Sequence, residues 1–496
     1  MKQMKLSPPH PRGGVRVLTW GLSCLVPLLP LATAQAEERP SDEDLFGAPA
    51  APAPAPAEAG ETRADETLFG APSTAATPSA ASALSAEVAP EDPLRLGGQL
   101  YTRMLGTLRE ETRPGKLTVS YPTLVDLYVD ARPNDRVRGM VIGRLQYNPL
   151  QYNVLFPGVS FGAYSATSTS VLLNQLWVNF DVDRKVFITA GRQFTKWGTG
   201  RFWNPTDYLQ PTRRDPLEPF DVRTGADMVK FHVPYEKLGW NFYAVALLEN
   251  LTPVPSIERT GVALRAETVF GSTELGLDAL LARYQVPRLG LDLSSGVGPV
   301  DVRAEVGIRP GKSFRLWRPV ENPVSEDLAD QYEQYTLDGW VPQASVGLDW
   351  QRTIGDDDVL TLGGETFINP LAGYDDASLY PWLIFQGAYN PFYTGKYYGA
   401  LFASLGSPGK WSDASLTFST IGNLSDLSFV SRLDFSNLLL THLRLEAYAA
   451  AYYGTRGGEF KLALDTEAQE LNGQSIPAIK SLAPMLDVGL SLRLSI

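Results

Sequence analysis

The sequence predicts an all-β fold, a closed antiparallel transmembrane β-barrel of about 18 strands preceded by a disordered segment. Three observations predict it. From residue 93 onward, apolar and polar side chains alternate with a period of two, the spacing that separates the two faces of a strand. Short turns alternate with long connections along this region. The N-terminus carries an export signal, and the alternation continues up to Ile496.

Residues 1–36 have the organisation of a secretory signal peptide. Four basic residues precede the apolar run VLTWGLSCLVPLLPL, and Ala34 and Ala36 flank Gln35 in the small-x-small pattern of signal peptidase sites. The single cysteine, Cys24, lies inside the apolar run. We therefore expect a mature chain without disulfides, thiolate nucleophiles or cysteine metal ligands.

Residues 37–92 are rich in alanine, proline, serine and acids, and are expected to form a disordered periplasmic tether. The phrases DEDLFGAPA (42–50) and DETLFGAPS (65–73) repeat within it. One interpretation is a pair of docking elements for a periplasmic export or scaffold protein, and the other is slippage within low-complexity sequence. The docking hypothesis rests on four apolar side chains, Leu45, Phe46, Leu68 and Phe69.

Charge and hydropathy restrict the function classes. The formal net charge is -12, and no basic footprint indicates a nucleic-acid partner. After the signal peptide, no apolar run approaches the roughly 18 residues of a membrane helix. Membrane insertion would therefore use strands, and in hydrocarbon a sheet must close on itself to pair every backbone N–H and C=O. This barrel is expected to occupy residues 93–496.

The segment 124–149, LVDLYVDARPNDRVRGMVIGRLQYNP, illustrates the alternation. Val125 and Leu127 share one face of its first strand, whereas Asp126 and Asp130 share the other. After the turn RPND, the chain returns with one apolar and one arginine-rich face. The pattern recurs in VDVRAEVGI (300–308), ASVGLDWQR (344–352), LRLEAYAAAYY (443–453) and LDVGLSLRLSI (486–496). Such a wall suits a boundary between lipid and water.

The connections predict which end of the barrel is elaborated. Short turns such as RPND, DVDRK, FGSTE, SGVGP and IGDDD alternate with long segments at about 149–170, 195–224, 309–341, 369–395 and 454–485. Aromatic residues near the strand ends would suit interfacial girdles: Tyr147, Trp177, Phe187, Trp240, Tyr243, Tyr452 and Tyr453. The acids Asp356, Asp357 and Asp358 are interpreted as a turn, because a full set of spaced calcium ligands is missing.

Four phrases between Gly191 and Pro219 carry a family resemblance: GRQ, KWGTG, WNPTDYL and RRDPLEP. They resemble the large porin-like outer-membrane proteins of Gram-negative bacteria, including barrels of the delta-proteobacterial type, some relatives of which accompany polysaccharide export. The resemblance covers residues 93–496 and implies outer-membrane lipid and the barrel assembly machinery as partners. Such barrels commonly end in an aromatic residue that this machinery reads, whereas this chain ends in Ile496.

Strand parity assigns charged side chains to the inner face, where acids and arginines nearly balance. A balanced lumen favours ion-pair networks along the wall, whereas a lumen of one sign would select ions by charge. Arg132, Arg136, Arg138 and Arg144 form the densest basic group and are the best candidates for an anion path. The predicted pore-lining residues are Arg132, Arg136, Arg138, Arg144, Asp126, Asp130, Asp301, Arg303 and Glu305.

The segment 195–224 combines four prolines, which prevent regular pairing, with more aromatic surface than a solvated loop carries. We expect it to fold inward and constrict the pore. The alternative is a surface loop that grips a partner or a glycan. The predicted constriction residues are Trp197, Arg201, Trp203, Asp207, Arg213, Arg214, Asp215 and Glu218.

The predicted function is an outer-membrane channel that passes hydrophilic solutes or polymer. The alternatives are a dedicated polysaccharide-secretion barrel and a non-conducting scaffold of an envelope-spanning machine. No catalytic residue, cofactor or metal is expected, because only His232 and His442 remain after export and no nucleophile–base arrangement or metal-spaced cluster accompanies them.

Overall fold

The computed structural model describes residues 93–113, 117–148, 169–210, 212–248, 260–282, 286–325, 327–354, 358–466, 469–471, 474–476 and 479–496. The predicted signal peptide, the tether 37–92 and the docking residues Leu45, Phe46, Leu68 and Phe69 lie outside the described residues. None of the described helices is both long enough and apolar enough to cross a membrane.

A single closed antiparallel sheet of 18 strands forms the wall. The strands are β1 (Leu94–Arg109), β3 (Thr123–Asn134), β4 (Val137–Tyr147), β5 (Thr169–Val182), β6 (Val186–Gln193), β7 (Ala226–Tyr235), β8 (Trp240–Leu247), β9 (Gly261–Phe270), β10 (Thr273–Ala282), β11 (Arg288–Val297), β12 (Val300–Pro310), β15 (Trp340–Ile354), β16 (Asp358–Ile368), β17 (Tyr397–Gly406), β18 (Ala414–Asn423), β19 (Ser428–Leu440), β20 (Leu443–Gly454) and β25 (Pro484–Ser495). The short β2 (Thr118–Ser120) pairs with the later part of β1, on the same side of β1 as β3, so it is not counted as a separate strand of the wall. The predicted closed barrel of about 18 strands is confirmed.

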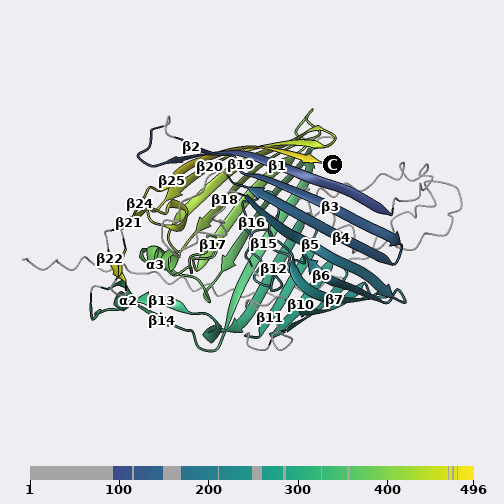
Figure 1. Cartoon of the computed structure of the whole chain (residues 1–496), viewed down its shortest axis with the longest axis horizontal. Helices are drawn as coiled ribbons and strands as arrows, with labels where there is room; N and C mark the ends of the chain where they lie inside the picture. Colours follow the sequence, from purple (N-terminus) through teal and green to yellow (C-terminus); the bar gives the residue numbers. More distant parts are fainter. Residues whose placement is uncertain are drawn as a thin grey trace, which may run out of the picture. The chain divides into compact units, whose positions relative to one another are not determined.

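Pairing of the first strand with the last closes the barrel. β1 pairs with β25 from Gln99 opposite Ser495 to Arg109 opposite Pro484, and with β3 on its other side. Figure 1 shows β25, which leads to the C-terminus, lying beside β1. Since β1 has a neighbour on both sides, the wall has no free edge there, and its backbone groups are satisfied within the protein.

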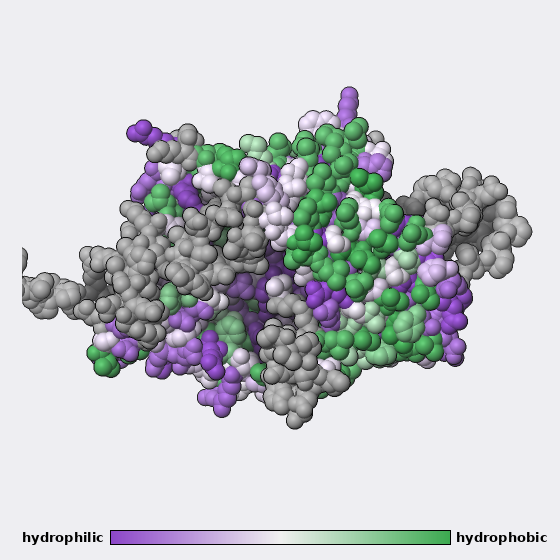
Figure 2. All heavy atoms as spheres, in the orientation of Figure 1, coloured by the Kyte–Doolittle hydropathy of each residue, from purple (hydrophilic) through white to green (hydrophobic). Residues whose placement is uncertain are grey.

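The two faces of the wall differ in polarity as the alternation predicts. On β3, Leu127 is 65% exposed while its neighbour Asp126 is 3% exposed, and on β10, Leu277 is 58% exposed while Asp278 is 5% exposed. Figure 2 shows apolar residues gathered over the wall where Figure 1 labels β3 and β4. An apolar surface of this extent on the outside of a closed sheet fits immersion in lipid.

We expect Leu277→Arg, in the middle of β10, to destabilise the folded barrel by about 2–4 kcal/mol, because a lipid-facing arginine near the midplane must be desolvated. The measurement is the urea unfolding midpoint of the barrel in lipid vesicles. Leu277→Ala is the matched control and should shift the midpoint less. Equal shifts in both variants would contradict a lipid-facing position.

The connections differ at the two ends of the barrel. The end that holds the start of β1 and the end of β25 has short turns, such as 135–136, 271–272 and 441–442. The other end has the long connections 194–225, 311–339, 369–396 and 455–483. These ranges match four of the five predicted long segments within a few residues. The fifth, at about 149–170, lies almost entirely outside the described residues.

The long connections hold short elements of their own. These are η5 (Gly311–Ser313), β13 (Leu316–Pro319), α2 (Leu328–Gln331), β14 (Tyr332–Tyr335), η6 (Ala377–Leu379), α3 (Tyr380–Phe385), η7 (Glu459–Lys461), β21 (Leu464–Thr466), β22 (Gln469–Leu471), β23 (Gln474–Ile476) and β24 (Ile479–Ser481). β13 pairs with β14, β21 with β24 and β22 with β23, so the connections fold on themselves as well as on the wall. Of the three acids interpreted as a turn, Asp356 and Asp357 lie outside the described residues, and Asp358 begins β16.

The girdle expectation was wrong for four of its seven aromatic residues. Trp177 lies under the guanidinium of Arg138, 5.6 Å from ring centre to Cζ. Phe187 and Tyr243 both pack on the His232 ring, and the Tyr452 hydroxyl donates to Asp487. All four belong to the inward row of their strands. In β5, for example, Leu176 and Val178 are exposed on either side of Trp177.

Candidate functional site

The connection between β6 and β7, residues 194–225, lies inside the barrel and is called here the constriction segment. Residues 202–210 are all buried, and Trp203 has no exposed surface. Carboxylates on one part of the wall accept hydrogen bonds from the segment, and arginines on another part donate to it. The alternative of a loop on the outer surface is therefore wrong for this segment. Its effect on ion flow remains a prediction.

Glu305 on β12 is the first anchor of the segment. Its carboxylate accepts hydrogen bonds from the backbone N–H groups of Thr199 (2.5 Å) and Gly200, from Asn204 Nδ2 (3.0 Å) and from Thr206 Oγ1 (2.9 Å). Glu305 is 1% exposed. A buried carboxylate is costly unless it is hydrogen-bonded, and four donors from one segment meet that need.

The glycines of KWGTG allow this close approach. Gly198 has φ +90°, and a Cβ there would lie 2.6 Å from the Glu305 carboxylate oxygens. A Cβ at Gly200 would lie 2.0 Å from the Trp203 carbonyl oxygen. A side chain at either position would push the segment off its anchor, which explains why the local sequence places glycine there.

Glu365 on β16 is the second anchor. It accepts from three consecutive backbone N–H groups, those of Arg201 (2.7 Å), Phe202 (3.2 Å) and Trp203 (2.8 Å). Three successive N–H groups converging on one carboxylate form an anion-binding nest, here closed by the protein's own side chain. The two glutamates therefore hold residues 199–206 against β12 and β16.

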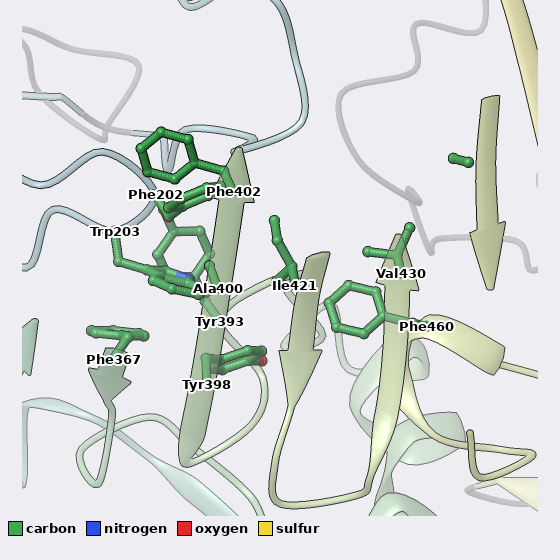
Figure 3. Packing of buried hydrophobic residues seen from close by; sticks show 11 residues of the cluster. Phe202, Trp203, Phe367, Tyr393, Tyr398, Ala400, Phe402, Ile421, Val430 and Phe460 are labelled. Atoms are coloured by element: carbon green, nitrogen blue, oxygen red, sulfur yellow. The ribbon is translucent and has the colours of Figure 1, made fainter. Parts of the chain in front are cut away.

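Trp203 joins the constriction segment to an aromatic cluster. Its ring stacks on Phe367 at 5.7 Å and 12°, and lies 5.6 Å from the Tyr398 ring. Its Nε1 donates to the Phe392 carbonyl oxygen at 3.0 Å. Figure 3 shows the Trp203 ring between Phe367 and the strand that carries Tyr398. The indole thus links the segment to the connection 369–396.

The later part of the segment is held by arginines on other strands. Arg103 on β1 pairs with Glu218 at 3.0 Å, and Arg432 on β19 donates to the Leu217 carbonyl oxygen at 2.7 Å. Arg144 on β4 donates to the Val222 carbonyl oxygen. Of these strands, β1 and β4 lie far around the wall from β12 and β16, so the segment crosses the lumen.

The remaining predicted constriction residues have varied surroundings. Asp207 pairs with Arg223 within the segment at 2.9 Å. Arg201 lies over the Phe402 ring, 4.0 Å from its centre, and is exposed. Trp197 packs near Arg265 of β9, whereas the Arg214 carbonyl oxygen accepts from the Tyr393 hydroxyl. Burial, with the nearby charge of Glu218, raises the pKa of Asp215 to about 6.

The predicted arginine group is paired with carboxylates. Arg144 and Asp126 form a buried ion pair at 2.7 Å, and Asp130 accepts from both Arg132 and Arg138. Arg136 pairs with Asp181 at the short-turn end. These four arginines therefore contribute to ion pairs along the wall, as the balanced charge predicts, rather than presenting free cations to a solute.

The three predicted pore-lining residues of β12 have different surroundings. Arg303 pairs with Asp349 of β15 at 2.6 Å. Asp301 is exposed near the short-turn end, and Glu305 anchors the constriction segment. Arg265 has three carboxylates around it, Glu267, Asp278 and Asp292. The three carboxylates outnumber the single arginine, but Asp278 and Asp292 are buried and so do not face water.

Three arginines near the long-connection end have no ion-pair partner among the described residues: Arg213, Arg288 and Arg309. Each lies over an aromatic ring, those of Tyr393, Tyr208 and Phe314, at 5.4, 5.7 and 5.9 Å. The positive charges of Arg213 and Arg288 lie close enough to Arg309 to repel its own positive charge. We call these residues the arginine triad. Parity could have found Arg309, which continues the inward row of Arg303 and Glu305, whereas nothing in the sequence relates Arg288 to the segment.

The two histidines lie toward the short-turn end of the barrel. His232 Nε2 lies 2.9 Å from Asn241 Oδ1, and the ring stacks on Tyr243 at 4.6 Å. His442 lies in the turn between β19 and β20. Within the described ranges, no three histidine, cysteine, aspartate or glutamate side chains are grouped so that they could hold a metal ion.

Comparison with known proteins gives similarity of fold. No family model matches the sequence, and no curated protein matches it. Solved structures with a similar fold include Pseudomonas aeruginosa OpdK with vanillate, at 11% identity and a TM-score of 0.46, covering 81% of this chain and 98% of that one. Acinetobacter baumannii OccAB4 has 6% identity and a TM-score of 0.47, covering 82% and 98%. A BenF-like porin from Pseudomonas fluorescens has 10% identity and a TM-score of 0.47, covering 82% and 99%.

Proposed function

We propose that this chain is an outer-membrane channel that passes small hydrophilic solutes, with a preference for anions. The observation that carries the proposal is the constriction segment, which crosses a closed barrel with a lipid-facing surface and contributes Arg213 to the arginine triad. An export signal and a barrel with short turns at the end holding both strand termini support insertion with those turns in the periplasm. The long connections then face outward.

The anchoring of the segment favours small solutes over polymer. It is bonded to β12 and β16 on one part of the wall and to β1, β4 and β19 on another. A polymer would require this buried segment to leave the lumen, which would expose the rings around Trp203 and strip donors from two buried carboxylates. A small solute needs no such rearrangement.

The arginine triad supports the preference for anions. Guanidinium groups remain charged at all physiological pH values, and these three have no carboxylate to neutralise them within the described chain. Positive charge in a narrow aqueous passage between low-dielectric walls concentrates anions. The aromatic rings beneath the guanidinium groups hold their planes without cancelling the charge.

The test is the reversal potential of the purified protein in planar bilayers under a KCl gradient. We expect anion selectivity, and the triple variant Arg213→Gln, Arg288→Gln, Arg309→Gln should lower the permeability ratio of chloride to potassium severalfold. Arg184→Gln is the control, since Arg184 is exposed at the short-turn end, paired with Asp135.

Two results would contradict the proposal in different ways. A cation-selective channel, or a triple variant with unchanged selectivity, would remove the preference for anions. A correctly folded protein without any current would favour the scaffold hypothesis instead. In that case, pull-down of a periplasmic protein that depends on Leu45, Phe46, Leu68 and Phe69 would be the next measurement.

A further inference from the structure

Two buried carboxylates at the long-connection end share one hydrogen-bond network to which no described residue contributes a cation. Asn423 Nδ2 donates to both Glu459 Oε2 (2.7 Å) and Asp426 Oδ2 (3.0 Å), and the Glu459 backbone N–H donates to Asp426 Oδ2 at 2.7 Å. Glu459 is 6% exposed and Asp426 is 8% exposed. Two like charges this close in a buried site are strongly unfavourable, so the pair favours holding a proton.

The groups that face this pair come from the connection 369–396 and from strands β17, β18 and β19. Tyr380 donates to Asp426, Tyr398 donates to Glu459, and the Tyr389 hydroxyl donates to the Glu459 carbonyl oxygen. Ser428 donates to Asp426 through both its N–H and its hydroxyl. All of these groups are neutral. The cations Arg456 and Lys461, on the same connection as Glu459, pair instead with Glu110.

Glu459 is connected to the constriction segment through Phe392. The Phe392 backbone N–H donates to Glu459 Oε1, and the Phe392 carbonyl oxygen accepts from Trp203 Nε1 at 3.0 Å. Phe392 has φ +66°, in the left-handed region that a non-glycine residue rarely adopts. Its strained conformation is therefore held from one side by the carboxylate and from the other by the indole.

A second path runs through Tyr398. Its hydroxyl donates to Glu459 Oε2 at 2.6 Å, while its ring lies 5.6 Å from the Trp203 ring. The Phe392 and Phe460 rings also pack together at 5.4 Å. Any change in the Glu459 carboxylate thus reaches both the hydrogen-bond partner and a ring neighbour of Trp203.

We propose that Glu459 and Asp426 form a proton-dependent latch that holds residues 386–396 on the constriction segment, and that release of the Glu459 proton to water loosens it. The proposal rests on the proposed function only where current is its readout. With both carboxylates ionised, their repulsion opposes the network, and Phe392 is freed to leave its left-handed conformation. Trp203 then loses its acceptor.

The direction of the pH effect follows from proton binding. Burial raises the pKa of Glu459 from its ordinary 4.5 to about 8; the charge of Asp426 contributes to the rise, and the Tyr398 hydrogen bond opposes it. Between these values the latched form binds one proton more than a released, hydrated Glu459. The latch is therefore fully stable below the lower value and weakens by up to about tenfold per pH unit as pH rises to the upper one.

The test compares the wild type with Glu459→Gln and Asp426→Asn between about pH 5 and pH 9. Glu321→Gln, at an exposed site on another long connection, is the control. In planar bilayers, we expect the wild-type current to fluctuate more, and its mean to rise, as pH increases. Glu459→Gln should lose this dependence. Asp426→Asn, which removes the neighbouring negative charge, should move the transition to lower pH, because Glu459 then ionises without an anion beside it.

A second readout does not require current. Hydrogen exchange of residues 386–396, compared between wild type and Glu459→Gln at each pH so that intrinsic exchange cancels, should differ in its pH dependence. A shift in electrophoretic mobility between unheated and heated samples checks that each variant is a folded barrel. A conducting wild type with flat current and flat exchange, or a Glu459→Gln variant with wild-type pH dependence, would overturn the latch. A silent protein with pH-dependent exchange would overturn the channel and keep the latch.

Discussion

Deletion of residues 199–219 is expected to raise the single-channel conductance severalfold, because it removes the part of the constriction segment that crosses the lumen. Residues 202–210 are buried between the wall strands, and two glutamates hold the backbone from Thr199 to Thr206. Without these residues, water and ions would fill the space they occupy, and Glu305 and Glu365 would be hydrated. The measurement is the conductance step of single channels in planar bilayers.

The matched control for this deletion is removal of residues 321–325. They form an exposed stretch of the connection 311–339, at the same end of the barrel. Their loss should leave the conductance unchanged. Should both deletions give wild-type steps while the barrels remain folded, the constriction segment does not limit the current.

Strand parity predicted most of the wall correctly because one physical demand repeats along every strand. Leu127 and Leu277 meet lipid while Asp126 and Asp278 lie inside, and this contrast is written in the sequence as a period of two. The same rule would have placed Trp177 inside, between the exposed Leu176 and Val178. The girdle prediction failed there because it relied on residue type rather than on position within the alternation.

The candidate site was only partly predictable, since its partners are distant in sequence. The composition of the segment 195–224 indicated an inward fold, and its glycines proved to be sites of close approach. The role of Glu365 was not predictable, because it anchors backbone N–H groups more than 160 residues earlier, an acceptor role that depends on the register of β16. Arg132, Arg136, Arg138 and Arg144 were predicted as an anion path from their density, but their pairing with Asp126, Asp130 and Asp181 depends on strand register, which the density does not show.

The two anchoring glutamates, Glu305 and Glu365, bind the constriction segment in the same way, so replacing either should strongly weaken its attachment to the wall. Each is buried on the wall and accepts mainly from the backbone of a segment without regular structure. Apart from substitution to proline, no side-chain change removes a backbone N–H group, so each buried N–H of the segment needs an acceptor. The glutamates satisfy these groups, and the segment in turn replaces the water that the carboxylates would otherwise require.

Glu305→Gln and Glu365→Gln are each expected to loosen the constriction segment by about 2 kcal/mol, because glutamine loses the charge and turns an amide N–H toward existing donors. The double variant should fall short of the sum, since both anchors hold the same short backbone stretch. The measurement is the rate of tryptic cleavage at Arg213 and Arg214 in the folded barrel, together with open-channel noise. Glu274→Gln on β10, which has no hydrogen bond to the segment within the described chain, is the control. Cleavage and noise that stay at wild-type levels in the double variant would mean that aromatic packing around Trp203 alone holds the segment across the lumen.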